Sequence, residues 1–368
     1  MEPVTHILTG ACLARAGCNR KAAYATLAMA VAAEFPDIDT LWSIGGPVAS
    51  FEHHRGWTHT LLGLPFEATF LVLLVWLLHR WRTRHGGITA APVRFGLLWC
   101  FVLLALLSHI FLDWTNNYGV RPFFPFNPHW YAGSFVFIFE PVLFVFLLGG
   151  LVLPSLFGLI NSEVGARKPA FRGRGWAVAA LLGACALWGW RAFEHSKAVQ
   201  TAHLDFDAIP VPPHPHDPGT LETVLYPATT RINSISASPY PIDPYHWHVI
   251  IDTPELYQTQ TFDTRTGLAE PLTPTDTIFK SAPTLATLAA KRSWLGQAYL
   301  DWSQYPVVSQ TSPDPNPNGP VTVTFQDLRF LYDTPLLKMR GRAPLTGTVF
   351  LDPNHRVERM ELDGRAQR

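Results

Sequence analysis

The chain has 368 residues, of which 48% are hydrophobic and 15% are charged, and its formal net charge is zero. This length predicts one large domain or two ordinary ones. The balanced charge excludes the strongly basic character that nucleic-acid binding requires, so we expect no nucleic acid partner.

Two short apolar stretches, residues 4–14 and 22–33, open the chain. Arg15, Arg20 and Lys21 lie in the connection between them, which predicts a helical hairpin with a basic tip. Each arm is short for a bilayer crossing, so a crossing hairpin and a buried or re-entrant one both remain open. The first 21 residues lack the order of a signal peptide, so we expect insertion to depend on internal segments.

Four segments are candidate membrane helices: residues 61–78, 95–112, 135–160 and 176–190. Each is about long enough to cross a hydrocarbon core of roughly 30 Å at 1.5 Å per residue. Basic residues cluster in 79–85 and 166–174, whereas the loop 113–134 has one arginine. The positive-inside rule therefore predicts that the basic loops are cytoplasmic and that residues after about 194 lie on the outer, periplasmic side.

The composition of the sequence changes after residue 194, where long apolar segments give way to polar and proline-rich ones. Residues 195–220 contain a proline-rich stretch that predicts an extended linker. Residues 221–368 contain short alternating segments such as "WHVIIDT" and "VTVTFQDL", with an apparent helix over 283–305. The expected fold is an α-helical integral membrane domain, residues 1–194, followed by a small, mainly antiparallel β soluble domain. The four cysteines, none at CxxC spacing, all precede residue 200 and are expected to be buried hydrophobic residues.

Potential metal ligands cluster in the membrane half. In "SHIFLDW", His109 and Asp113 are four residues apart and share one helix face. "PDID" adds Asp37 and Asp39, and "HHRGWTH" adds His53, His54 and His59 around a glycine that permits a turn. The complete predicted ligand set also includes the residue near the start of the chain, His6.

The predicted topology brings these residues to helix ends at one membrane depth. Nitrogen and oxygen ligands without thiolate suit a divalent transition metal, Zn²⁺ first and Mn²⁺ or Fe²⁺ as alternatives, in one or two sites. Taken singly, each residue could equally be a helix cap or an ordinary polar group.

Arg55 and Glu67 are the candidate catalytic residues beside the ligands. Arg55 could hold an anionic group such as phosphate, or could anchor the chain at the membrane surface. Glu67, placed within an apolar helix, is a candidate proton relay or a group that orients a ligand. Asn116 and Asn117 could orient ligands as well.

The motifs "VTHILTGACLARAG", "PDIDTLW", "HHRGWTHTLLG" and "SHIFLDWTNNYG" resemble those of the YdjM-type, LexA-regulated, membrane-bound family of predicted metal-dependent hydrolases. The resemblance covers about the first 150 residues. It implies a hydrolase in the bacterial inner membrane, with metal ligands at His6, Asp37, Asp39, His53, His54, His59, His109 and Asp113.

A weaker likeness connects the chain to zinc-dependent phospholipase C, through the order histidine, aspartate, histidine and then HxxxD. The further downstream ligands of that enzyme have only His129 and Glu140 as candidates here. Two clusters of the soluble half, His214–His216–Asp217 and His246–His248, are interpreted as structural or surface features.

The sequence thus predicts a membrane-bound metal-dependent hydrolase that uses a metal-activated water, acting on a phosphoester or lipid-like substrate. The expected partners are membrane lipids and a small-molecule or lipid substrate, and the oligomeric state is left open. The alternative is a non-catalytic membrane protein with a structural metal site or an ion pathway.

Overall fold

The computed structural model describes residues 1–163, 173–205, 208–211, 229–271, 274–280, 283–312, 319–331 and 342–367. The chain divides into two compact units. Unit 1 consists of Met1–Leu41 and His53–Phe193, and unit 2 consists of Trp42–Glu52 and Glu194–Arg368. Each unit is described separately below.

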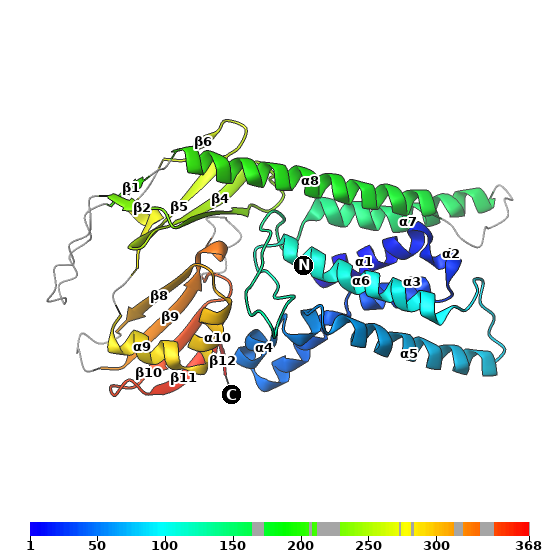
Figure 1. The fold of residues 1–368 in the computed structure, drawn as a ribbon, viewed down its shortest axis with the longest axis horizontal. Helices are drawn as coiled ribbons and strands as arrows, with labels where there is room; N and C mark the ends of the chain where they lie inside the picture. The colour runs from blue at the N-terminus through cyan, green and yellow to red at the C-terminus, as the bar shows by residue number, and fades with distance from the viewer. Residues whose placement is uncertain are drawn as a thin grey trace. The chain divides into compact units, whose positions relative to one another are not determined.

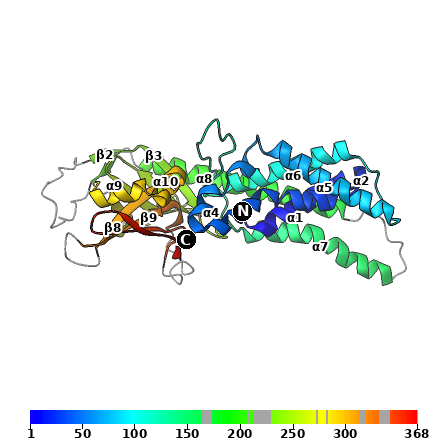
Figure 2. The ribbon, with the colours of Figure 1, turned by 90° about the horizontal axis from the view of Figure 1, so that it is seen from below.

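Long apolar helices dominate unit 1 (Figures 1 and 2). Among the described residues, three helices are long and apolar enough to cross a membrane: α5 (Leu64–Arg84), α6 (Phe95–Thr115) and α8 (Arg174–Asp205). The fourth predicted segment forms α7 (Pro141–Glu163), whose apolar part, Pro141–Phe157, is shorter. The predicted fold class, a helical membrane region followed by antiparallel sheets, is confirmed.

The N-terminal hairpin lies inside unit 1. Its arms are α1 (Pro3–Leu13) and α3 (Ala25–Ala32), joined by a π-helical turn, Ala14–Cys18, and by α2 (Asn19–Lys21). Eleven residues rise only about 17 Å, which is well short of a bilayer core. The arm α3 packs into the core of unit 1 through Ala25, Ala28, Met29 and Ala32.

Gly10 of α1 permits the close packing of the two arms. A Cβ atom at this position would lie 2.2 Å from the carbonyl oxygen of Met29 and 2.7 Å from the Cβ of Ala33. Only a residue without a side chain lets the backbones approach so closely. The hairpin thereby fixes the end of α3, from which the chain continues into the metal-ligand segment.

Two short 3-10 helices and α4 (Pro47–His53) carry the chain from the hairpin to α5. The first 3-10 helix, η2, spans Phe35–Gly45, and the second, η3, spans Trp57–His59. Residues 42–52, in the middle of this connection, pack within unit 2. There Phe51 stacks on Tyr299 at 5.6 Å, and Glu52 accepts a hydrogen bond of 2.8 Å from the indole of Trp294.

Antiparallel sheets form most of unit 2. One sheet has the order β3-β4-β5-β6, with β7 also paired to β5, another has the order β12-β11-β10-β9-β8, and β1 pairs with β2. Helices α9 and α10 pack against strands β8, β9 and β10 of the second sheet. The first group of strands comprises β1 (Ala208–Pro210), β2 (Thr229–Arg231), β3 (Ser234–Pro239), β4 (His246–Asp252), β5 (Leu256–Asp263), β6 (Leu268–Ala269) and β7 (Thr277–Phe279). The remaining elements are α9 (Leu285–Arg292), α10 (Trp294–Trp302), β8 (Pro306–Thr311), β9 (Val321–Asp327), β10 (Gly347–Leu351), β11 (Val357–Leu362) and β12 (Arg365–Ala366).

The structure differs from the sequence analysis in two details. The segment interpreted as the start of a linker continues α8 as far as Asp205, while residues 212–220 lie outside the described residues. The cysteines are not uniformly buried, because Cys100 and Cys185 lie on exposed faces of α6 and α8. A membrane helix presents apolar side chains outward as well as inward, so hydrophobicity alone does not predict burial there.

Candidate metal centre

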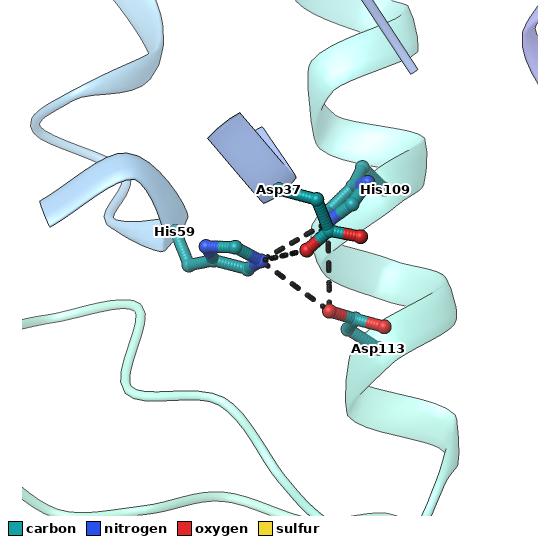
Figure 3. A group of neighbouring side chains, drawn as sticks. All are labelled: Asp37, His59, His109 and Asp113. Carbon is teal, nitrogen blue, oxygen red and sulfur yellow. Dashed lines mark hydrogen bonds and ion pairs between the residues drawn. The ribbon is translucent and has the colours of Figure 1, made fainter. Parts of the chain in front are cut away.

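Four side chains from three separate segments converge in unit 1 (Figure 3). Asp37 comes from η2, His59 from η3, and His109 and Asp113 lie one turn apart on α6. Each offers one ligand atom, and these four atoms all lie within 4.8 Å of one another. His59, His109 and Asp113 are fully buried.

The distances between these atoms match the edges of a small tetrahedron. The Nε2 atoms of His59 and His109 are 3.1 Å apart, and His59 Nε2 lies 3.3 Å from Asp37 Oδ1 and 3.4 Å from Asp113 Oδ2. His109 Nε2 lies 3.6 Å and 3.5 Å from the same two oxygens. Tetrahedral Zn²⁺ with ligands at about 2.0–2.1 Å separates neighbouring ligands by about 3.3–3.4 Å.

Hydrogen bonds on the far side of each imidazole direct the Nε2 lone pairs into this tetrahedron. His109 Nδ1 donates to the carbonyl oxygen of Ala33 at 2.7 Å. His59 Nδ1 faces the Thr58 hydroxyl at 3.1 Å and Asp39 Oδ2 at 3.4 Å. With a hydrogen on each Nδ1, both Nε2 atoms are acceptors, and each meets a second acceptor at close range.

The carboxylate oxygens complete a set of acceptors without a donor. Asp37 Oδ1 and Asp113 Oδ2 are buried and have no hydrogen-bond partner. Two imidazole lone pairs and two carboxylate oxygens in such proximity repel one another unless positive charge lies between them. The donor set therefore fits a divalent metal ion.

The two carboxylate oxygens of Asp113 have different neighbours. Its Oδ1 atom accepts a 2.8 Å contact from Arg55 Nη2, lies 3.3 Å from His6 Nε2 and contacts the amino group of Met1. Its Oδ2 atom faces the two imidazoles of the cluster. The His6 ring is buried and stacks on His109 with the ring centroids 3.9 Å apart.

Arg55 is buried, and its partners are protein groups. It donates to the carbonyl oxygen of Gly119 at 2.7 Å and lies 4.7 Å above the ring of Tyr118. Asn116 Oδ1 is 3.4 Å from the same guanidinium. Arg55 thus ties the η3 loop to the end of α6 and partly neutralises Asp113.

Asp39 organises the loop that carries His59. Its Oδ2 atom accepts a 2.7 Å hydrogen bond from the backbone N–H of Arg55, and its Oδ1 atom lies 3.2 Å from His54 Nδ1. Arg55 has a left-handed φ of 54°, and a Cβ atom on Gly56 would lie 2.7 Å from the carbonyl oxygen of His53. The glycine permits the tight turn that points His59 inward.

A second group of potential ligands shares Asp37 with the first. It comprises Asp37, Asp39 and His54, whose ligand atoms also lie within 4.8 Å of one another. His54 is more open than the first group, with 35% of its side chain exposed. In total, the two groups contain six of the eight predicted ligands.

The electrostatics of the centre differ from those of isolated carboxyl groups. For Glu34, burial together with the charge of Asp37 raises the pKa to about 7. Glu34 Oε2 is buried without a hydrogen-bond partner.

Glu34 was missed by the sequence analysis, although it lies two residues before the quoted aspartate motif. An acidic residue at the end of an apolar helix is a usable signal, but a cap or a solvated carboxylate gives the same pattern. Ala33, whose carbonyl oxygen orients His109, carries no such signal because a backbone group has no sequence signature.

Other predicted residues lie elsewhere. His53 ends α4 and belongs to neither group, and Glu67 lies in the first turn of α5 with a buried Oε2 atom that has no hydrogen-bond partner. Glu140 pairs with Arg191, and exposed His129 contacts the ring of Tyr131, so neither joins the two groups.

Two histidines of unit 2 make local contacts. His246 lies 2.6 Å from Asp243 Oδ2, and His248 Nε2 donates to the carbonyl oxygen of Leu328 at 3.2 Å. The cluster at residues 214, 216 and 217 lies outside the described residues.

The fold and the site together define a multi-helix membrane protein with a buried histidine–aspartate cluster that could hold a metal ion. The family model described as YdjM inner membrane protein matches residues 1–198. The chain belongs to this family and is an inner membrane protein.

Comparison with individual proteins adds one relative. The chain is 26% identical over 161 residues to "Uncharacterized protein YfhP" of Bacillus subtilis (strain 168), which covers 42% of this chain and 46% of the relative. The chain therefore spans about half the length of that relative. No solved structure matches the chain.

Proposed function

We propose that this protein is a membrane-bound metal-dependent hydrolase whose metal ion is held by Asp37, His59, His109 and Asp113. The observation that carries the proposal is the convergence of four buried acceptor atoms, two of them imidazole nitrogens only 3.1 Å apart. Imidazole and carboxylate ligands without thiolate favour Zn²⁺, with Mn²⁺ and Fe²⁺ as alternatives.

The surrounding residues have distinct parts in this proposal. A bound Zn²⁺ would polarise the scissile bond and lower the pKa of a water molecule toward neutrality. Asp39 and Ala33 hold the two imidazoles in the tautomer that binds metal. Glu34, with a pKa of about 7, can accept or return a proton near neutral pH, and Glu67 is a second candidate for proton transfer.

A phospholipid or another amphiphilic phosphoester is the substrate class that we propose. Apolar side chains flank the ligand segments and remain exposed: Trp57 is 61% exposed and Phe66 71%. Such residues suit the boundary between lipid and water. We further propose that the centre and unit 2 lie on the outer side of the membrane, because the basic connections fall at the other helix ends.

The test is a comparison of metal content and hydrolysis between two histidine variants. Full-length protein is purified in detergent, assayed for bound metal by elemental analysis, and screened against phosphodiester, lipid and amide substrates. We expect His59→Ala to lose the metal and the activity, and His53→Ala, in the same segment but outside both groups, to keep them. A wild-type protein that contains no transition metal would overturn the proposal.

A metal that only staples the helices together would give a different result. His109→Ala would then unfold the protein, which circular dichroism and gel filtration detect. A catalytic metal predicts instead a folded variant without activity.

A further inference from the structure

A cationic pocket lies at the end of unit 1 that is remote from the metal centre. Its volume is about 560 Å³, which is within the usual range for small-molecule sites. It is lined by the hairpin tip, the end of α5, the loop before α6 and part of α7. The polar lining residues include Arg15, Asn19, Tyr24, Arg82 and Ser155.

The position of the pocket follows from α6. His109 and Asp113 lie near the C-terminal end of this helix, whereas residues 88–91, which line the pocket, come shortly before its N-terminal end. The 21 residues of α6 rise about 31 Å, which is close to the thickness of a hydrocarbon core. His109 and Asp113 lie 14 and 18 residues beyond Phe95, so α6 separates them from its pocket-facing end by about 21–27 Å.

The two arginines have spare hydrogen-bonding capacity. Arg15 donates from Nη1 to the carbonyl oxygen of Leu151 at 2.9 Å, and Arg82 lies 5.7 Å above the ring of Tyr24. Neither is within ion-pair distance of a carboxylate in the part of the chain that the structure describes. A guanidinium offers five N–H donors in a planar fork, which matches the oxygens of a phosphate group.

Two further features indicate a binding site. Asn19 lines the pocket, and its Oδ1 atom is buried without a hydrogen-bond partner. The backbone of the wall is irregular, because Ala14–Cys18 forms a π-helical turn and Tyr24 has a φ of 66°. Both kinds of irregularity concentrate at functional sites and persist only where the surroundings hold them.

Most of the other lining residues are apolar, which points to an amphiphile. They include Ala22, Leu27, Ile88 and Pro154. A second cavity of about 330 Å³ also borders the hairpin tip and is lined by Arg20, Lys21 and Arg174 beside Leu13 and Phe101. The tip therefore presents basic side chains with apolar neighbours in both cavities.

We propose that the Arg15–Arg82 pocket binds the phosphate headgroup of an anionic phospholipid in the leaflet that faces the basic loops. The guanidinium groups contact the phosphate oxygens, the Asn19 amide meets a headgroup hydroxyl, and the apolar wall accepts the start of an acyl chain. Basic pockets between membrane helices recognise anionic headgroups in this manner.

The test is lipid binding to the full-length protein in detergent, measured by native mass spectrometry. Phosphatidylglycerol and phosphatidylcholine are titrated separately, because only the first carries a net negative charge. We expect clearly tighter binding of phosphatidylglycerol, weakened about fivefold by Arg82→Gln and by Arg15→Gln. The matched control is Arg84→Gln, which removes the same charge two residues further along α5, outside the pocket, and is expected to bind normally.

Several results would overturn the proposal. Equal binding of the two lipids would exclude an anionic headgroup, and an equal loss in Arg84→Gln would show a diffuse surface charge effect. Displacement of phosphatidylglycerol by millimolar inorganic phosphate would assign the pocket to a soluble phosphate ester. Arg82 is exposed, so its substitution tests the proposal even if Arg15→Gln fails to fold. The readout does not depend on hydrolysis, and so it is independent of the proposed activity.

Discussion

At the residue scale, Asp39 shows how one carboxylate can orient a neighbouring candidate metal ligand, His59. It accepts the backbone N–H of Arg55 at 2.7 Å and faces His59 Nδ1 at 3.4 Å. A carboxylate in this position fixes the imidazole orientation and increases its basicity.

We predict that Asp39→Asn retains one metal ion per chain but binds it about 10–100-fold more weakly, because the neutral amide orients His59 poorly. Competition with a coloured chelator measures the affinity, and elemental analysis measures the stoichiometry. A fall from two ions to one would show instead that Asp39 is a direct ligand in the group with Asp37 and His54.

His248 gives a pH-dependent prediction for unit 2. Burial, only partly offset by the hydrogen bond to Leu328, lowers the pKa of His248 from 6.5 to about 4. Between these pH values the unfolded chain binds a proton that the folded chain excludes, so the free energy of unfolding decreases as the pH falls from 6.5 towards 4. The full loss corresponds to about 3 kcal/mol.

Hydrogen exchange of peptides from β4 in the full-length protein, corrected for intrinsic rates, measures this dependence. We expect His248→Gln, which can still donate to the carbonyl oxygen of Leu328, to flatten the profile between pH 6.5 and 4. An unchanged slope in the variant would show that other groups are responsible.

Residue types and spacing were enough to single out the candidate ligands but not to predict how they group in space. His109 and Asp113 could be paired because a spacing of four residues fixes their geometry on a helix. Nothing local distinguishes His59 from His53 or His54, since that depends on the turn at Gly56 and on the contacts of Asp39. Which of the predicted residues bind metal therefore stays a prediction.

At the scale of elements, the hairpin of α1 and α3 controls the geometry of the centre. α1 carries His6, and the residue after α3, Ala33, accepts the hydrogen bond from His109. The two arms approach each other at Gly10, so a substitution there would displace both His6 and the Ala33 carbonyl group.

We predict that Gly10→Ala destabilises unit 1 by about 1–3 kcal/mol, the usual cost of overpacking, because the new Cβ meets the Met29 carbonyl oxygen at 2.2 Å. The metal affinity should decrease together with the stability. Thermal unfolding in detergent checks the first effect, and chelator competition checks the second.

The control for this substitution is Gly96→Ala in α6, where a Cβ atom meets nothing within 4 Å. It should be neutral or slightly stabilising, because alanine favours a helix over glycine. If both variants behave alike, the close approach of the arms does not matter.

Element prediction from the sequence succeeded where periodicity was strong. α5, α6 and α8 follow the apolar segments, and β4, β5, β9, β10 and β11 follow the alternating ones. The failures were at boundaries and connections. α8 passes the expected end of the membrane domain because residues 191–205 lack a helix breaker, and the 3-10 helix η2 has no periodic signature.

At the scale of the whole molecule, the membrane orientation follows from basic loops rather than from contacts. Arg80, Arg82 and Arg84 end α5, whereas the loop after α6 has few basic residues. The positive-inside rule therefore predicts a cytoplasmic α5–α6 connection.

We predict that alkaline phosphatase fused after Arg368 is active and that the same reporter fused after Gly87 is inactive, because the enzyme needs an oxidising compartment to form its disulfides. A green fluorescent protein reporter should give the opposite pattern. An inactive phosphatase after Arg368 would reverse the orientation and place the metal centre on the cytoplasmic side.

The segment Trp42–Glu52 belongs to unit 2, yet it lies in the sequence between the candidate ligands Asp37 and His59. When unit 2 is folded, the middle of this connection is already ordered. Bringing Asp37 and His59 close to each other then costs less conformational entropy. Halving a flexible loop reduces its closure cost by about 0.6 kcal/mol. Thermodynamic reciprocity then predicts that a metal ion bound by Asp37 and His59 would in turn favour the ordering of these eleven residues.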